Sequence, residues 1–409
     1  MTAEAGGGAS GTAQPPAITS RPRVLEISSP ITAVAGRFLA DAGAEVVKVE
    51  APGAGVAAPT AGEALANRLY LDTDKRSITL DTASAAGRAV LARLAPRFDI
   101  VLESGEPGRL ASIGAGWDVL STANPGLTLA SITPFGQWGP YSHYKADDLV
   151  VFAMGGMMFV SGVPELPPVV APCRQGFVAG GIHAAMAALA CWRATRLRGA
   201  PGEWIDVSLV EALAAQENTI TNFKGGSDFT RREGSQHRNG NPGRVFRCKD
   251  GYVHLLIQHD EQVWARFVAW LGHPPELQGD GFDTLLARRS KAEIITETTA
   301  RILLTRTREE IFDGGQEAHL PIAAVFSITE ALADPQVVHM NVLERVPAGG
   351  VAGPAEAGYR TLRPPYQRGR SLPSRRPAPA RGQDTDAVLA EIGGLGAQEI
   401  AQLRRDGVV

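Results

Sequence analysis

The chain has 409 residues, of which 44% are hydrophobic and 20% are charged, and its formal net charge is −3. This composition is typical of globular proteins, and the length predicts two domains. A charge so close to neutral supplies no basic field, so we expect no nucleic-acid partner. Three cysteines, Cys173, Cys191 and Cys248, lack the spacing of zinc ligands or of a disulfide framework. We therefore expect no metal and a cytoplasmic location.

Residues 1–21 are rich in Gly, Ala and Pro and have no apolar segment, which predicts a disordered tail without a secretion signal. A regular pattern begins at Arg23. The order of apolar and amphipathic stretches predicts strands at 23–29, 45–53, 77–81, 99–104 and 127–133, and helices at 32–44 and 85–98. Strand and helix alternate repeatedly, which favours a doubly wound, Rossmann-like α/β domain with a parallel sheet.

The segment 167–213 follows this region and joins an extended stretch, a run rich in Ala and Gly, and the alternating sequence WIDVSL. It predicts a loop, a closely packed helix, a turn and a strand, because small residues let a helix approach its neighbours. The apolar run from Gly176 to Trp192 has only 17 residues, contains His183 and is followed by arginines. It is short for a bilayer, so we expect a buried helix and no membrane association.

The pattern changes after Leu213. Two short hairpin arms, 246–248 and 252–257, are followed by helices at 263–272 and 293–304, which indicates a smaller α+β domain. The segment 363–382 is rich in Pro and Arg and predicts a surface linker that returns to the first domain. Two short helices with a break at Gly393–Gly394 end the chain. The predicted division is 1–21 tail, 22–222 large domain, 223–332 small domain and 333–409 linker and return.

Few single motifs carry chemistry. The first strand is not followed by GxGxxG, and neither GxxxxGK[ST] nor HExxH occurs. We interpret Lys75–Arg76 as a solvated basic turn. An open alternative is that the pair faces a ligand crevice, because it lies at the end of a strand. His183 is interpreted as a hydrogen-bonded core residue. Asp147–Asp148 is interpreted as a helix N-cap or a surface pair, with a coupled carboxylate pair as the alternative.

Taken in order, ten sequence blocks point to one family. They include ADAGAEVVKVEAPG, DKRSITLD, SITPFGQWGPY, DDLVVFAMGGMM, VAGGIHAAMAALA and G-x-WIDVSLVEAL. The chain resembles class III CoA-transferases (the CaiB/BaiF or formyl-CoA transferase family) over nearly everything after Arg23. The resemblance implies a large domain built from both chain ends, an inserted small domain, and dimers of two interlocked ring-like protomers.

The resemblance also implies a reaction that moves CoA from an acyl-CoA to a carboxylic acid, with CoA as part of the substrate. In this family an aspartate attacks the thioester and forms a mixed anhydride, and backbone N–H groups stabilise the oxyanion. A related branch of racemases uses the same aspartate together with a histidine.

The chain departs from the family pattern at these positions. Phe177 occupies the place of the nucleophilic aspartate, and no Asp or Glu lies between Glu165 and Glu203. The racemase histidine is replaced by Asp147. Four family positions that are basic fall at Ala51, Ala83, Ser112 and Lys145, so that only Lys145 keeps its charge, and Arg109 is a partial substitute. By the resemblance, the residues expected to contact CoA are Leu80, Ser104, Gly105, Arg109 and Lys145.

Three hypotheses remain open. The chain is the aspartate-less subunit of a two-gene enzyme of the succinyl-CoA:benzylsuccinate type, paired with a same-family subunit. Alternatively, it is an active homodimer in which Cys173, Asp148 or Glu26 has taken over the chemistry. The third hypothesis is a non-catalytic protein that binds CoA esters. The sequence does not identify the organic acid.

Overall fold

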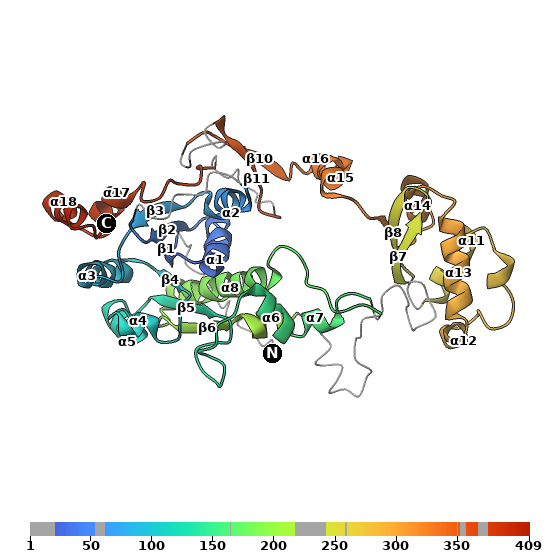
Figure 1. The fold of residues 1–409 in the computed structure, drawn as a ribbon, viewed down its shortest axis with the longest axis horizontal. Helices are drawn as coiled ribbons and strands as arrows, with labels where there is room; N and C mark the ends of the chain where they lie inside the picture. Colours follow the sequence, from blue (N-terminus) through green and yellow to red (C-terminus); the bar gives the residue numbers. More distant parts are fainter. Residues whose placement is uncertain are drawn as a thin grey trace, which may run out of the picture. The chain divides into compact units, whose positions relative to one another are not determined.

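The computed structural model describes residues 21–53, 62–163, 165–216, 243–257, 260–349, 351, 357–366 and 375–409. The chain forms two compact units (Figure 1). The first comprises residues up to 155, 173–216 and 343–409, and therefore contains both ends of the chain. The second comprises 156–172 and 217–342, so it includes a segment that the sequence analysis assigns to the large domain. The predicted boundary between 222 and 223 lies outside the described residues.

A six-stranded sheet forms the centre of the first unit, and every neighbouring pair of its strands is parallel. The strand order is β3-β2-β1-β4-β5-β6. The strands are β1 (Arg23–Ile27), β2 (Glu45–Glu50), β3 (Arg76–Thr79), β4 (Ile100–Glu103), β5 (Thr128–Thr133) and β6 (Trp204–Ser208). The order reverses between β1 and β4, where doubly wound sheets bind ligands at the carboxyl ends of their strands. The predicted α/β class is confirmed.

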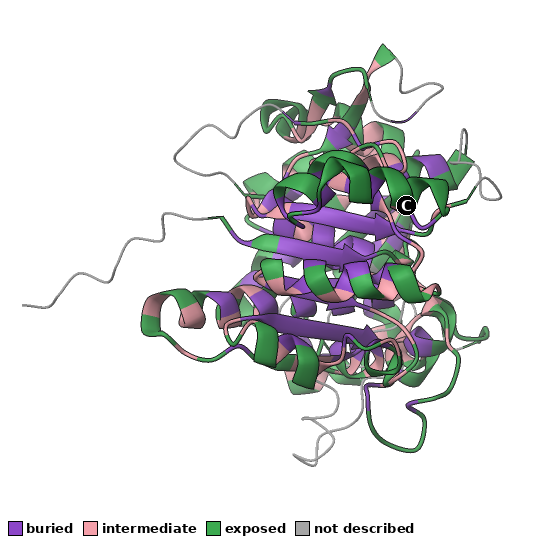
Figure 2. Ribbon diagram, turned by 90° about the vertical axis from the view of Figure 1, so that its left-hand side faces the viewer, coloured by how far each residue is buried: buried purple, intermediate pink, exposed green. Residues whose placement is uncertain are grey.

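Helices cover both faces of this sheet, and Figure 2 shows buried strands between helices with exposed outer sides. The helices of the first unit are α1 (Pro30–Asp41), α2 (Gly62–Asp72), α3 (Ala85–Leu94), α4 (Arg109–Ser112), α5 (Trp117–Ala123), α6 (Asp148–Met154), α8 (Gln175–Arg198), α9 (Leu209–Ala214), α17 (Thr385–Glu391) and α18 (Ala397–Arg405), with the 3₁₀ turn η1 (Ala95–Arg97). Helices α1 and α8 pack on each other over one face. Apolar residues of α3, α5, α17 and α18 join the core on the other face.

Helix α8 lies close to its neighbours because of two glycines. A Cβ atom at Gly181 would lie 2.5 Å from Val34 Cγ1 of α1, and one at Gly180 would lie 2.1 Å from Leu209 Cδ2 of α9. The predicted role of small residues in close packing is confirmed. The helix has 24 residues, longer than the 17 expected, and by length and composition alone it could cross a membrane. In this structure 44% of its most apolar window is buried, so the helix packs on its neighbours along part of its surface.

Lys75 is not a solvated turn residue, and that interpretation was wrong. Its side chain is buried, and Nζ lies 2.6 Å from Glu26 Oε2, 3.4 Å from Asp72 Oδ1 and 3.0 Å from the Ala33 carbonyl oxygen. Asp72 also pairs with Lys48 at 2.6 Å. Lys75 precedes β3 and therefore lies away from the carboxyl ends of the strands, so the ligand-facing alternative does not hold either. The sequence could not reveal this cluster, because its partners are up to 49 residues apart.

The end of the chain returns to the sheet beside β3. The backbone N–H of Ser77 donates to Asp384 Oδ2 at 2.9 Å, and Asp384 N–H donates to the Ser77 carbonyl oxygen at 2.8 Å. This return to the first unit was predicted, but the preceding segment is not wholly a surface linker. Arg375 within it is buried and pairs with Asp41 at 2.7 Å, and also with Asp74 and Glu344. The tail 1–20 lies outside the described residues.

Two antiparallel sheets complete the fold. In the second unit β7 (Gly243–Cys248), β8 (Gly251–Leu256) and β9 (Ile322–Ala324) form one sheet, and in the first unit β10 (Leu343–Val346) pairs with β11 (Tyr359–Leu362). The predicted hairpin arms are thus confirmed. The other elements of the second unit are α7 (Met157–Val160), α11 (Glu261–Trp270), η2 (Pro275–Leu277), α12 (Leu285–Arg289), α13 (Ala292–Leu303), α14 (Arg308–Glu317), α15 (Ile328–Ala333) and α16 (Pro335–His339).

Candidate active site

Phe177 lies in the first turn of α8 and is 9% exposed. The residue before this helix, Arg174, has a left-handed backbone with φ of 50°, and its side chain does not cap the helix. The cap comes from another element, because the Phe177 N–H donates to Asp148 Oδ1 of α6 at 2.9 Å. A carboxylate at this place stabilises the partial positive charge of the helix N-terminus. The side chain at this position is therefore an aromatic ring, and the backbone N–H of the same residue is already hydrogen-bonded to Asp148.

The two neighbouring aspartates are both caps. Asp147 is the N-cap of α6, where its Oδ1 accepts from Val150 N–H at 3.1 Å. Asp148 caps α8. The N-cap interpretation of this pair is confirmed, and nothing in the described residues makes them a coupled pair.

The other proposed catalytic residues differ in access. Cys173 is exposed, four residues before Phe177, and its backbone is left-handed with φ of 68°. Glu26 is fully buried beside Lys75, a position from which a carboxylate cannot reach a thioester. His183 is exposed and its Nδ1 lies 2.8 Å from the Ala179 carbonyl oxygen, so it is hydrogen-bonded as predicted but is not a core residue.

The residues expected to contact CoA follow the carboxyl ends of β3 and β4. Leu80 follows β3, and its side chain lies in the apolar core, so contact with a ligand would involve its backbone. Ser104 and Gly105 follow β4. Strands β2 and β1 lie between β3 and β4. At the spacing of parallel strands, Leu80 is therefore roughly 14 Å from Ser104 and Gly105.

The two cations of this set lie on the surface. Arg109 begins α4 and folds over Gly105, where an added Cβ atom would lie 2.8 Å from Arg109 Cδ. The Ser112 hydroxyl donates to the Arg109 carbonyl oxygen at 2.8 Å, and these two residues begin and end the one-turn helix α4. Lys145 is exposed in the loop between β5 and α6. Arg109 and Gly105 are therefore brought together, while Lys145 has no contact with them that supports a common site.

A row of polar side chains that the sequence analysis missed crosses three neighbouring strands of the sheet. Glu103, Ser131 and Asp206 occupy paired positions on β4, β5 and β6. Burial raises the pKa of Glu103, while the hydrogen bond of Ser131 and the charge of Arg109 lower it. Asp206 Oδ2 accepts from Gln137 N–H at 2.9 Å, and burial raises the pKa of Asp206 as well. An acidic residue at the end of a buried strand was the signal available in the sequence.

Comparison with known proteins identifies the family. The family model CoA-transferase family III matches residues 22–385. The chain belongs to this family. A solved structure, Rv3272 from M. tuberculosis, has a TM-score of 0.78 and 25% identity, with 92% of this chain and all of that chain covered.

Two curated relatives are also similar. The Mycobacterium tuberculosis protein named "Probable CoA-transferase Rv1866" is 31% identical over 87% of this chain, but the match spans only 45% of that protein. The succinyl-CoA:(R)-benzylsuccinate CoA-transferase subunit BbsE of Thauera aromatica is 28% identical over 95% of this chain and 98% of that subunit. Among the described residues no group of three or more His, Cys, Asp or Glu side chains could hold a metal.

Proposed function

We propose that this chain takes part in the transfer of CoA between an acyl-CoA and a carboxylic acid as the subunit without the nucleophilic aspartate, in a cytoplasmic heteromeric enzyme. The observation that carries the proposal is Phe177 in the first turn of α8. A phenyl ring has no lone pair with which to attack a thioester, and the nearest carboxylate, Asp148, accepts the Phe177 N–H. The reacting carboxylate then comes from the partner.

In the proposed reaction, the partner's aspartate attacks the thioester carbonyl carbon, and CoA leaves as the thiolate. The thiolate attacks the aspartyl carbonyl carbon of the mixed anhydride, which releases the donor carboxylate and leaves an aspartyl-CoA thioester. The acceptor carboxylate attacks this thioester and forms a second mixed anhydride, with the thiolate as the leaving group. The thiolate then attacks the acceptor's acyl carbon, which yields the new acyl-CoA and regenerates the aspartate. This chain's own half-site is silent. Its contribution is structural and, through Ser104, Gly105, Arg109 and Lys145, a contact surface for CoA that has fewer cations than family members carry.

Exposed apolar side chains of the first unit support the proposal that a partner subunit binds there. Trp138 is 65% exposed and Tyr144 59% in the loop after β5, and Met186 is 63% exposed on α8. Phe135, Tyr141 and Tyr144 also form an aromatic cluster with ring centroids 5.0–6.4 Å apart. Aromatic residues and Met are enriched in protein interfaces, and monomers rarely expose such patches. The relative BbsE is named as a subunit. We propose that an interlocked same-family partner covers this surface.

The test is the isolation of the native complex from the source organism, with each subunit identified by mass. We expect a second same-family chain with Asp at the position equivalent to Phe177. Co-expressed with that chain, this protein transfers CoA, and replacement of the partner's aspartate by Ala abolishes transfer. The matched control is Phe177→Leu in this chain, which leaves the rate of the complex within about twofold of the original.

One observation favours the active homodimer as a second candidate: Cys173 is exposed and not buried as an inert thiol would be. Turnover by the single purified chain, lost on Cys173→Ser, would establish it and overturn the heteromeric proposal. Acyl-CoA binding by the single chain without turnover, and without a same-family partner in the native complex, would instead establish the non-catalytic alternative.

A further inference from the structure

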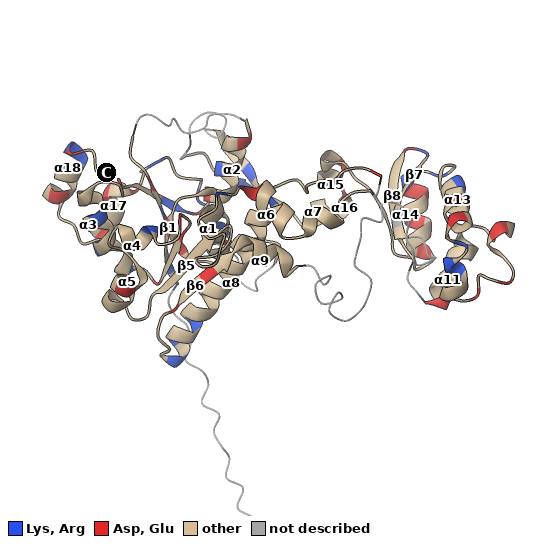
Figure 3. Ribbon diagram, turned by 60° about the horizontal axis from the view of Figure 1, so that its bottom comes forward, with Lys and Arg blue, Asp and Glu red and all other residues tan. Residues whose placement is uncertain are grey.

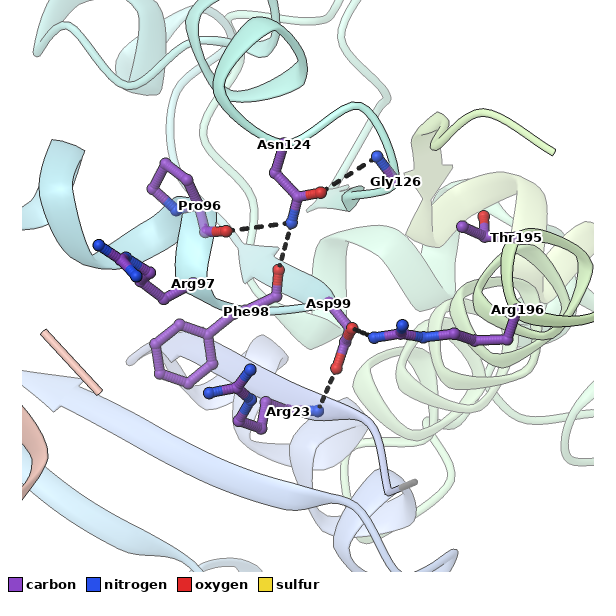
Figure 4. A pocket seen from close by; sticks show the side chains of 9 residues that line it. All are labelled: Arg23, Pro96, Arg97, Phe98, Asp99, Asn124, Gly126, Thr195 and Arg196. Carbon is purple, nitrogen blue, oxygen red and sulfur yellow. Dashed lines mark hydrogen bonds and ion pairs between the residues drawn. The ribbon is translucent and has the colours of Figure 1, made fainter. Parts of the chain in front are cut away.

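A cavity of about 260 Å³ lies at the amino-terminal ends of β1 and β4, the opposite edge of the sheet from the residues expected to contact CoA (Figure 4). All of its lining residues belong to the first unit. The cavity is too small for a whole cofactor but large enough for a compact ion or the end of a larger molecule. It belongs neither to the α8 N-terminus nor to the positions after β3 and β4.

Three arginines and one aspartate surround the cavity. Asp99 pairs with Arg196, and it also accepts from the backbone N–H of Arg23 at 2.8 Å. Within the described part of the chain, the guanidinium groups of Arg23 and Arg97 pair with no carboxylate. One aspartate against three arginines gives the cavity two net positive charges. Figure 3 shows further basic residues at the carboxyl-terminal end of α8.

The carboxyl-terminal end of α8 repels an anion in the cavity only weakly. The carboxyl end of a helix carries about half of a negative charge, and two guanidinium charges outweigh it. The last carbonyls are also in use, since Gly199 N–H donates to the Thr195 carbonyl oxygen at 3.0 Å. The electrostatic potential of the cavity is therefore positive.

The neutral groups of the wall present no free acceptor to an anion. Asn124 is held in place, because its Nδ2 donates to the carbonyl oxygens of Pro96 and Phe98 at 3.0 Å and its Oδ1 accepts from Gly126 N–H at 3.1 Å. It therefore presents no free acceptor that would repel an anion. The hydroxyl of Thr195 is hidden from solvent and has no partner among the described residues. Because this hydroxyl is closed off from the cavity, it neither binds nor repels an anion there.

We propose that this cavity binds a compact phosphate group, as inorganic phosphate or as the phosphomonoester end of a larger molecule. The planar guanidinium groups of Arg23 and Arg97 match pairs of phosphate oxygens, and the two net charges match a dianion. The site is independent of CoA transfer and of the proposed partner subunit.

The test is isothermal titration calorimetry of the full chain with inorganic phosphate and, separately, with adenosine 3′-phosphate. Four variants are compared with the original protein: Arg23→Gln, Arg97→Gln, Lys145→Ala and Arg289→Gln. Arg289 is an exposed arginine of the second unit, so Arg289→Gln removes the same charge at a place outside the cavity. Arg97 is exposed, so its replacement leaves the fold intact even if Arg23→Gln disturbs β1.

We expect saturable binding of both probes that weakens about tenfold or more in each cavity variant, the loss of one charge-assisted contact. Arg289→Gln and Lys145→Ala should bind inorganic phosphate as the original does. Tighter binding of adenosine 3′-phosphate than of phosphate would identify a phosphomonoester, and equal binding would identify free phosphate. Absence of saturable binding at about 10 mM phosphate, a level at which even weak sites fill, would overturn the proposal, as would equal affinity in all variants.

Discussion

The backbone N–H of Phe177 donates a hydrogen bond to Asp148 Oδ1, 29 residues earlier in the chain and 2.9 Å away. This contact joins the first turn of α8 to the first turn of α6. It places a carboxylate beside Phe177, but in the role of a helix cap. The chemistry expected of this chain therefore depends on whether that carboxylate holds the helix or attacks a substrate.

Replacement of Asp148 separates these roles. Asp148→Ala removes the cap and should lower the free energy of unfolding by about 1 kcal/mol, whereas Asp148→Asn keeps an acceptor and should cost less. Guanidinium unfolding followed by circular dichroism measures both. Asp118→Asn, an exposed residue near the start of α5, is the control. If Asp148→Asn kept full stability but abolished turnover by the single chain, the carboxylate would be catalytic.

Restoring an aspartate at the family position should not restore the enzyme. Phe177→Asp places a second negative charge near Asp148 and buries it, at a cost of about 3 kcal/mol. By the family resemblance, we also expect basic contacts for CoA to be missing at Ala51, Ala83 and Ser112. We expect transfer by the single chain far below that of family enzymes in a CoA-transfer assay, with Phe177→Leu as the control for loss of the ring. Activity near that of a normal transferase would refute the weakened CoA site.

Lys145→Ala should weaken the binding of any CoA ester. Lys145 is the one basic family position that keeps its charge, and a charged hydrogen bond contributes about 1.5–3 kcal/mol, or tenfold or more in affinity. Calorimetry with an acyl-CoA measures the change. Lys249→Ala removes an exposed lysine of the second unit and is the matched control. Unchanged affinity in Lys145→Ala would remove this residue from the CoA site.

Because Lys75 and Glu26 form a buried ion pair, we expect the single and the double replacement to differ greatly in the free energy of unfolding. Lys75→Met leaves Glu26 buried without its closest cation and should cost about 3–5 kcal/mol. The double replacement Glu26→Leu with Lys75→Met removes both charges, while Asp72 keeps Lys48 at 2.6 Å. It should be much less destabilising in the same unfolding experiment. Equal losses in the single and double variants would show that packing, and not charge, determines the effect.

Glu103 predicts a dependence of stability on pH. Burial raises its pKa in the folded state, so its contribution to stability is complete below the unfolded value of about 4.3 and is lost as the pH rises through the folded value. The stability of Glu103→Gln relative to the original should therefore increase from about pH 5 to about pH 8. Unfolding of both proteins across this range measures it. A constant difference between the two proteins would contradict the raised pKa of Glu103.

The sequence alone determined the elements and the class of fold. Alternation of apolar strands such as 23–27 and 100–103 with amphipathic helices is a local property, because the repeat of each element is written in neighbouring residues. The small residues Gly180 and Gly181 likewise indicated close packing before any contact was known. The family resemblance indicated the return of the chain end to the first domain and marked Phe177 as the expected departure from the pattern.

Only the tertiary structure decided what surrounds the charged groups. Lys75 reads as a surface turn because its neighbours in sequence are polar, but its burial depends on Glu26 and Ala33, which other elements bring to it. Asp148 caps a helix that begins 27 positions further along, and the arginines of the cavity meet from β1, η1 and α8. Electrostatic interactions act through space between residues that the chain order separates, so local pattern cannot predict them.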